Sequence, residues 1–340
     1  MSFFLMGAHE RLKNNQLMRL HEMIDWNRIE GLLSKIHKRD WTRGGGPTPY
    51  RPVQMFKAVL LSHWHQLSDQ GLVDSLQVRL DFMLFTGFEI GMSLPDESTF
   101  CRFRNRLSDL QLDEQLFEEI NRQLAEHGLA VKEASMAILD ATIIESANRP
   151  RRCIEVSQDR EEQADDEATS NVLTTEPRIV ESADPDARWL KKGNRFFFGY
   201  KGFVCVEARH GFIRSLHVTP ANRSEVKEFE TAINRTGSVD CVLADKGYAS
   251  KSNRAWLKDR GITDGIMIKA TQGNPLDDLD KQLNRLISKA RYKVERCFGT
   301  LKQRFGFTRS RYRTLVRVES ELYWKAMCFN LLKAERLYRA

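Results

Sequence analysis

The sequence lacks the features that mark several large classes of protein. Its six cysteines include no Cys-x-x-Cys pair and no close cluster with histidine, which argues against a zinc site or a disulfide framework. No apolar run approaches the length of a membrane span, and the first residues lack the basic stretch and apolar core of a signal peptide. Internal repeats are also absent. We therefore expect a soluble cytoplasmic protein that makes no membrane contact.

The charged residues that are present have a basic balance. Fifty-three Lys and Arg stand against 46 Asp and Glu, which gives a formal net charge of +7. Acidic, Ser and Thr residues crowd between Glu155 and Asp186, where large apolar residues are scarce, so the remainder is more basic still. This composition predicts a mobile surface insertion at about 155–188. The basic remainder favours a polyanionic partner such as nucleic acid, although many soluble proteins are mildly basic.

Residues 1–130 have the apolar spacing of amphipathic helices, with a Gly- and Pro-rich linker at 42–49. Capping residues near Asp96 predict the start of a helix that carries Arg102 and Arg106 one turn apart on one face. That face suits contact with phosphates or with a groove of DNA. A solvated arginine face on an ordinary bundle helix is an equally good interpretation.

Residues 131–340 alternate between strands and helices. We expect a strand that ends at Asp140, followed by a hairpin of two strands at 196–207 and 212–219. Then come a helix at 224–233, a strand at 239–244, a helix at 251–260, a strand at 265–269 and a long helix at 279–305. A closing helix is expected at 322–337. This order is typical of an α/β, ribonuclease H-like mixed sheet flanked by helices, here preceded by an all-helical region. In that fold the first and fourth strands lie side by side.

Three acidic residues lie in this pattern of strands and helices, two after strands and one in the long helix. Asp140 follows an apolar strand, Asp245 follows another, and Glu295 lies in the long helix. A single Asp at a strand end is more often a cap or a turn residue. Together, however, three carboxylates predict a site for Mg²⁺ or Mn²⁺, and two such ions can cut a phosphodiester.

Basic and aromatic residues surround this trio in the sequence. Arg291 and Lys302 share a helix face with Glu295 and suit a phosphate beside the metal, although taken alone Arg291 and Glu295 are better interpreted as a surface ion pair. Tyr248 is a candidate for stacking on a displaced base, although core packing is the commoner role of such a ring. A basic patch suited to backbone contacts follows the long helix: Arg304, Arg309 and Arg311.

Several ordered motifs resemble those of bacterial insertion-sequence DDE transposases, in particular the branch named after insertion sequence five. The motifs are Ile138–Thr142, Phe198–Phe203, Val218–Asn222, Ala244–Tyr248 and Arg291–Lys302, and Tyr50–Leu107 resembles the helical region of that family. One departure is Ser288, which stands where the family signature usually has tyrosine.

The resemblance implies that Asp140, Asp245 and Glu295 form the catalytic triad, with Arg291 and Lys302 as the basic residues of the signature. It implies a bacterial, nucleoid-associated enzyme that binds double-stranded DNA at the terminal inverted repeats, cleaves the ends and transfers them to target DNA with two metal ions. It also implies a homodimer in the DNA complex, with residues 1–130 in DNA binding and dimerisation. The alternatives are an inactive transposase-derived repressor and a ribonuclease H-like nuclease without strand transfer.

Overall fold

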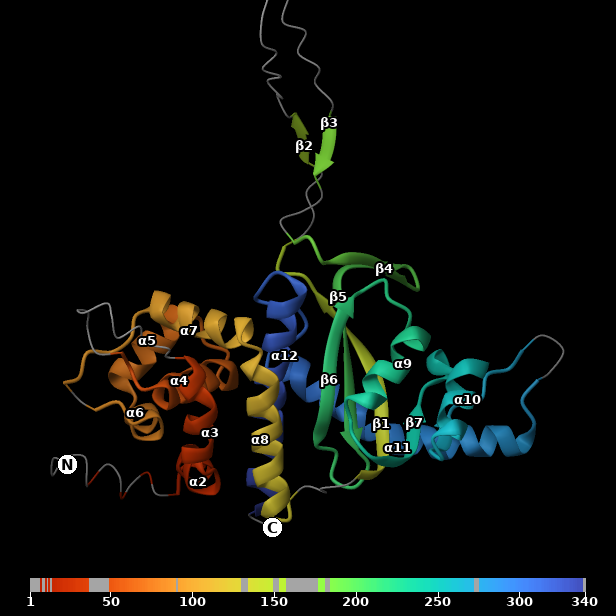
Figure 1. The fold of residues 1–340 in the computed structure, drawn as a ribbon, viewed down its shortest axis with the longest axis horizontal. Helices are drawn as coiled ribbons and strands as arrows, with labels where there is room; N and C mark the ends of the chain where they lie inside the picture. Colours follow the sequence, from red (N-terminus) through yellow and green to blue (C-terminus); the bar gives the residue numbers. More distant parts are fainter. Residues whose placement is uncertain are drawn as a thin grey trace, which may run out of the picture.

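The computed structural model describes residues 14–36, 49–89, 91–129, 134–148, 153–156, 177–180, 184–271 and 275–338, together with the single positions 7, 10 and 12 (Figure 1). The predicted linker at 42–49 lies outside these residues except for its last position. Most of the predicted insertion at 155–188 also lies outside them.

The N-terminal region is helical, as predicted. Its helices are α2 (Gln16–Met23), α3 (Trp26–Leu33), the short η1 (Ser34–Ile36), α4 (Pro52–Trp64), α5 (Asp69–Val78), α6 (Leu80–Thr86), α7 (Glu97–Asp109) and α8 (Leu112–Glu126). Arg79 takes an extended conformation and separates α5 from α6. The start of α7 is capped by the Asp96 carboxylate, which accepts from the Thr99 backbone N–H at 2.6 Å.

The second region is built on a mixed sheet. Its strands are β1 (Ala134–Glu145), β4 (Arg188–Lys192), β5 (Arg195–Glu207), β6 (Ile213–Pro220), β7 (Val239–Ala244) and β8 (Thr263–Ile266), while β2 (Cys153–Val156) and β3 (Pro177–Val180) pair separately. The strand order is β4-β5-β1-β7-β8, and β6 also pairs with β5, off this path. The first strand is parallel to its neighbour β7, and β5 is antiparallel to β1. This is the predicted ribonuclease H-like order, and the fold class is confirmed.

Helices cover both faces of this sheet (Figure 1). A core of β1, β5 and β7 side chains packs on one face against α9 (Glu225–Asn234) and α10 (Lys251–Asp259). On the other face lie α11 (Asp278–Gln303) and α12 (Leu315–Tyr338). A short 3-10 turn, η2 (Lys246–Tyr248), follows β7.

The last helix joins the two regions. It packs against α8, α4, α2 and α7 as well as against β6 and β5, and it begins seven residues earlier than predicted. Trp324 is fully buried, with its ring centroid 5.0 Å from that of Phe56 and 5.5 Å from the stacked ring of His63. A single apolar cluster therefore includes the N-terminal helices, α12 and one face of the sheet.

A buried ion pair in α12 fixes the segment between α11 and α12. Lys325 Nζ lies 3.4 Å from Glu321 Oε1 and donates to the Phe305 carbonyl at 2.6 Å. Glu321 Oε2 accepts from Ser310 Oγ at 2.8 Å and from the Arg311 backbone N–H at 2.9 Å. Because both charges are completely buried, each depends on these partners.

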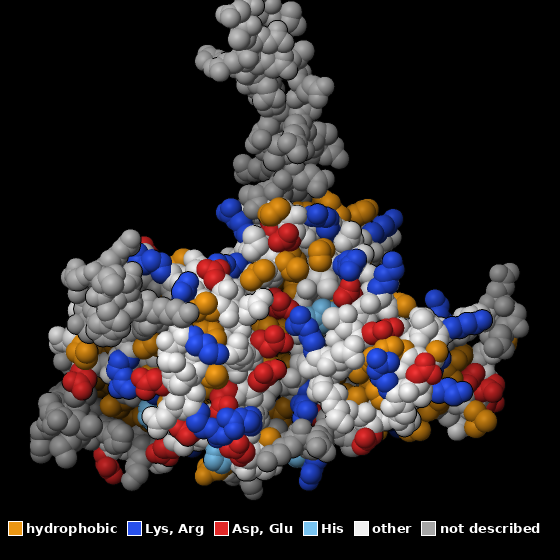
Figure 2. All heavy atoms as spheres, viewed as in Figure 1, with side chains coloured by type: hydrophobic (Ala, Val, Ile, Leu, Met, Phe, Trp, Pro, Cys, Tyr) orange, Lys and Arg blue, Asp and Glu red, His pale blue; other side chains and the backbone are white. Residues whose placement is uncertain are grey.

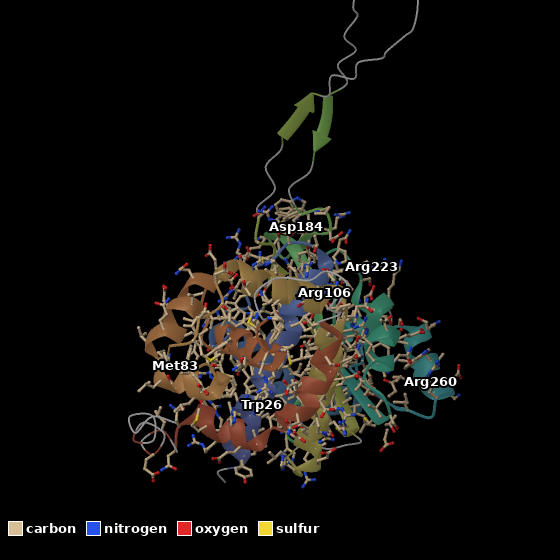
Figure 3. All side chains as sticks on the ribbon, turned by 60° about the vertical axis from the view of Figure 1, so that its left-hand side comes forward. Trp26, Met83, Arg106, Asp184, Arg223 and Arg260 are labelled. Atoms are coloured by element: carbon tan, nitrogen blue, oxygen red, sulfur yellow. The ribbon has the colours of Figure 1, made fainter. Side chains whose placement is uncertain are left out.

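The far end of the predicted insertion is part of the folded body. Asp184 is 2 % exposed and lies at the upper end of the sheet, below β2 and β3 (Figure 3). Its carboxylate accepts from Ser146 Oγ and the Tyr200 hydroxyl, and from the Thr314 backbone N–H at 3.1 Å. The predicted surface insertion is therefore wrong at this end, because these residues anchor the return of the chain into β4.

In the part of the chain that the structure describes, no helix has the length and apolar character needed to cross a membrane.

Candidate active site

The two candidate aspartates lie at the same end of a pair of parallel strands. The prediction that the strand ends at Asp140 is wrong. The strand β1 continues to Glu145, because Ile143 and Ile144 extend the apolar pattern. Its pairing with β7, however, stops at Leu139 opposite Ala244. Asp245 is the residue that follows β7. Both carboxylates therefore lie where the two parallel strands part.

Both aspartates face α11. Ile138 and Leu243 belong to the core on that side of the sheet, and the two-residue period of a strand directs Asp140 to the same face. Arg291 of α11 donates to Asp140 Oδ2 at 2.8 Å, and the same guanidinium nitrogen lies 3.9 Å from Asp245 Oδ2. Arg291 is only 8 % exposed. A buried positive charge thus lies between the two carboxylates.

The protonation equilibrium of Asp140 reflects this environment. Burial raises the pKa of its carboxyl above the usual range, whereas Arg291 and the backbone N–H of Ala141 act in the opposite direction. The nearby Asp245 carboxylate adds to the rise. Two partly buried carboxylates so close together are stabilised by positive charge, and their hard oxygen atoms are suited to a divalent cation.

Glu295 follows Arg291 by one turn of α11 and is exposed. It lines a shallow hollow together with Tyr292, Arg296, Arg304 and Arg336, among other residues. Within the described ranges, no three His, Cys, Asp or Glu side chains are close enough together to hold a metal ion. The structure therefore brings Asp140 and Asp245 together with Arg291, and does not bring Glu295 into a three-carboxylate cluster with them.

The loop after Asp245 explains the Ala244–Tyr248 motif in physical terms. A Cβ atom at Gly247 would lie 2.6 Å from Glu225 Oε2, so a larger residue here would require the Glu225 side chain at the start of α9 to shift. Tyr248 is completely buried, and its ring centroid is 5.9 Å from that of Phe229. The predicted role of Tyr248 as a base-stacking platform is wrong in this structure, because its ring belongs to the core.

Two polar residues near this loop were missed by the sequence analysis. Lys201 lies in the Phe198–Phe203 motif and is 7 % exposed; its Nζ is 3.3 Å from Glu225 Oε1 and donates to the Arg223 carbonyl at 3.0 Å. The pair links β5 to the start of α9, beside the loop that carries Asp245. A lysine in the middle of a mainly apolar strand was the signal that could have revealed it.

The residues predicted to contact DNA have different surroundings. Arg102 and Arg106 are exposed on α7, while Arg104 between them is buried and makes two hydrogen bonds of 2.6 Å to Asp69. Lys302 is half-buried, and its pKa is lowered by burial and by the charge of Lys192.

Two of the arginines after α11 also have structural contacts. Arg309 Nε donates to the Ser146 carbonyl at 2.9 Å, and Arg311 donates to the Leu67 carbonyl at 2.7 Å. Arg304, Arg309 and Arg311 are exposed. Their role in DNA binding stays a prediction.

Comparison with known proteins decides the family. A family model described as "Transposase DDE domain" matches residues 132–331, and a second one, described as a transposase domain, matches residues 6–106. The chain belongs to the DDE transposases. It is therefore an enzyme, a DNA transposase, and its family implies the use of divalent metal ions.

A curated relative supports the insertion-sequence assignment. The transposase is 42 % identical over 236 residues to "Transposase for insertion sequence element IS1106" of Neisseria meningitidis serogroup B, covering 69 % of this chain and 77 % of the relative. The predicted recognition as a bacterial insertion-sequence DDE transposase is confirmed.

Solved structures give weaker similarities. The piggyBac transposase synaptic complex with hairpin DNA matches with a TM-score of 0.46 and 9 % identity, over 96 % of this chain and 76 % of that one. The Mos1 transposase paired-end complex with the left transposon end matches with a TM-score of 0.21 and 12 % identity, over 88 % and 81 % of the two chains.

Proposed function

We propose that this transposase binds double-stranded DNA at the terminal inverted repeats of its element, cleaves the phosphodiester at each end and joins the ends to target DNA. The observation that carries the proposal is the placement of Asp140 and Asp245 side by side at the end of β1 and β7, against Arg291. A protein that only binds DNA has no need to hold two carboxylates together at the cost of burying them.

Asp140 and Asp245 would hold Mg²⁺ or Mn²⁺, and Glu295, which lies outside their cluster among the described residues, is the third ligand of the proposal. Two such ions would activate the attacking oxygen and stabilise charge on the leaving oxygen. Arg291 orients the Asp140 carboxylate and neutralises both aspartates. Lys302 lies two turns beyond Glu295 on α11 and would contact the adjacent phosphate.

The partner surface extends over both regions. Arg102 and Arg106 of α7 and Arg304, Arg309 and Arg311 after α11 provide exposed positive charge for the DNA backbone. Synapsis of two ends would use a homodimer. The enzyme would act on the bacterial nucleoid in the cytoplasm.

Cleavage of a labelled duplex that carries the element's own end, with and without Mg²⁺, tests the proposal. Asp140→Asn and Glu295→Gln should each lower the cleavage rate at least about 100-fold and leave duplex binding intact, because they remove metal ligands and no basic residue. Asp240→Asn on β7 and Glu230→Gln on α9, both exposed, are the matched controls and should cleave normally.

The two alternatives give different results in the same assay. Specific duplex binding without cleavage by the wild-type protein would identify a repressor. Metal-dependent cleavage of the end without joining to a target plasmid would identify a nuclease. Full activity of Asp140→Asn would overturn the catalytic assignment.

A further inference from the structure

The hairpin formed by β4 and the start of β5 has an unusual composition. Residues 188–198 contain four cations and four aromatic residues and no Asp or Glu: Arg188, Trp189, Lys191, Lys192, Arg195, Phe196, Phe197 and Phe198. We infer that this hairpin is a nucleic-acid contact in which Trp189 and Phe196 stack on unpaired bases while the surrounding cations bind the phosphates. The inference rests on the proposed function in taking DNA as the partner.

The aromatic rings are available for stacking. Trp189 is 53 % exposed and Phe196 is 65 % exposed, among the most exposed of the large apolar side chains in the described part of the chain. Trp189 pairs with Phe198 and Lys191 with Phe196 in the antiparallel register, so these four side chains share one face of the hairpin. The Trp189 ring lies 5.3 Å from that of Phe198, which supports it from one side. Lys191 Nζ lies 5.5 Å from the Phe196 ring centroid.

In the described part of the chain, the cations of the hairpin are not used for ion pairs. Within the described residues, Arg188, Lys191, Lys192 and Arg195 form no salt bridge with any carboxylate. The positive charge of Lys192 also acts on the half-buried Lys302 of α11 and lowers its pKa. Figure 2 shows Lys and Arg side chains beside hydrophobic ones at the upper end of the sheet, where β4 lies in Figure 1. A nucleic acid offers phosphates to the cations and flat bases to the exposed aromatic rings. An ordinary apolar protein segment offers a partner to the rings alone.

The hairpin face lies on the same side of the sheet as the candidate active site. Phe198 and Val204 are an even number of residues apart on β5, so their side chains lie on the same face of the sheet. Val204 lies opposite Asp140 in β1. Six residues of strand separate the levels of Phe198 and Val204, which is roughly 20 Å at about 3.3 Å per residue. At about 3.4 Å per nucleotide, that length corresponds to about six nucleotides of one strand. A strand held at the aspartates can therefore reach the hairpin.

Fluorescence anisotropy with two labelled DNAs tests the inference: a blunt duplex carrying the element end, and the same duplex with a single-stranded extension. The full-length wild-type protein should bind the extended DNA more tightly. Trp189→Ala and Phe196→Ala should each weaken binding to the extended DNA by about tenfold or more, and should leave binding to the blunt duplex unchanged. Trp189→Phe should restore most of the affinity. Tyr338→Ala, which removes a ring that is 67 % exposed on α12, is the control and should have no effect.

The outcomes separate this inference from the proposed function. If the wild type binds the blunt duplex and gains nothing from the extension, the inference is overturned and the proposed function stands. If the wild type binds neither DNA, the proposed function fails as well. If Trp189→Ala lowers the self-association of the protein in sedimentation without changing the affinity for either DNA, the hairpin contacts a second copy of the chain and the inference is wrong.

Discussion

Arg291 has the most consequential contacts of any residue in the candidate site. It belongs to a helix, lies almost completely buried, and places its guanidinium between carboxylates from two different strands. Sequence reasoning assigned it to the DNA because it lies on one face with Glu295 and Lys302. In the structure it is first a partner of Asp140, so its contribution to phosphate binding depends on what else neutralises that aspartate.

Arg291→Met should lower the free energy of unfolding by about 3 kcal/mol in the absence of divalent ions, because it leaves Asp140 partly buried without its partner. Urea unfolding followed by circular dichroism measures the loss. Saturating Mg²⁺ should raise the stability of the variant more than that of the wild type, because a bound cation replaces the missing charge.

Arg285→Met, on an exposed turn of the same helix, is the control and should change the stability by less than about 0.5 kcal/mol. Equal effects of Mg²⁺ on the wild type and on Arg291→Met would argue against a metal site at Asp140 and Asp245.

Asp113 gives a pH-dependent prediction at the same scale. It is 4 % exposed in the first turn of α8, and burial raises its pKa to about 6. The unfolded chain releases this proton near pH 4, so between about pH 4 and 6 the folded state holds a proton that the unfolded state has lost. The contribution of Asp113 to stability therefore falls as the pH rises through this window and stays low above pH 6.

Asp113→Asn should remove this dependence. The variant should be more stable than the wild type at pH 7, by roughly 2 to 3 kcal/mol, and should match it near pH 4. Thermal or urea unfolding across pH 4 to 7 measures both curves. A constant difference across the whole range would show that Asp113 does not titrate in this window.

At the scale of secondary structure, the elements with a strong pattern were predictable. The strand β7 has the predicted bounds, and α10 and α11 begin within one residue of their predicted starts, because short apolar runs and amphipathic periods are local properties of the chain. The split between α5 and α6 was not predictable, because Arg79 has no propensity to break a helix and its extended conformation goes with a contact to Asp81.

Other differences have a tertiary origin. The strand β4 was not predicted. Four of its five residues are exposed, on both faces of the strand, so no alternation of apolar and polar residues marks it. The position of Asp140 within β1, and not at its end, follows from pairing with β5, which continues beyond the last contact with β7. The burial of Tyr248 depends on Phe229 from a different helix. Proximity of Asp140 to Asp245 was predictable from the order of elements alone.

The α12 helix gives a prediction at this scale. Lys325→Met should destabilise the protein by about 3 to 5 kcal/mol in urea unfolding, because it leaves the Glu321 carboxylate buried without a counter-charge. A second substitution, Glu321→Gln, made in the Lys325→Met background should recover part of the loss. Lys281→Met removes the exposed pair with Asp278 and should cost less than about 1 kcal/mol. Equal losses for the two lysines would contradict the role assigned to the buried pair.

At the scale of the whole molecule, the boundary predicted near residue 130 divides the sequence but not the core. Apolar side chains of α2, α4 and α8 form one cluster with α12 and with the sheet. The N-terminal helices therefore bury their apolar faces against an element from the opposite end of the sequence.

A fragment spanning residues 49–129 should consequently lack a cooperative unfolding transition, whereas the full-length protein should unfold with coincident loss of helical signal and of tryptophan burial. Circular dichroism and tryptophan fluorescence measure the two signals. A fragment that melts cooperatively on its own would establish residues 49–129 as an independent domain.

The position of α12 also has a consequence for folding during synthesis on the ribosome. About 260 residues are made between the start of α4 and the start of α12, which takes roughly 13 to 50 seconds at about 5 to 20 residues per second. During that interval the helices made first lack α12, against which α2, α4, α7 and α8 pack in the native structure, and are open to chaperones or to wrong pairing. We expect the nascent chain to reach its native state only after α12 has left the exit tunnel.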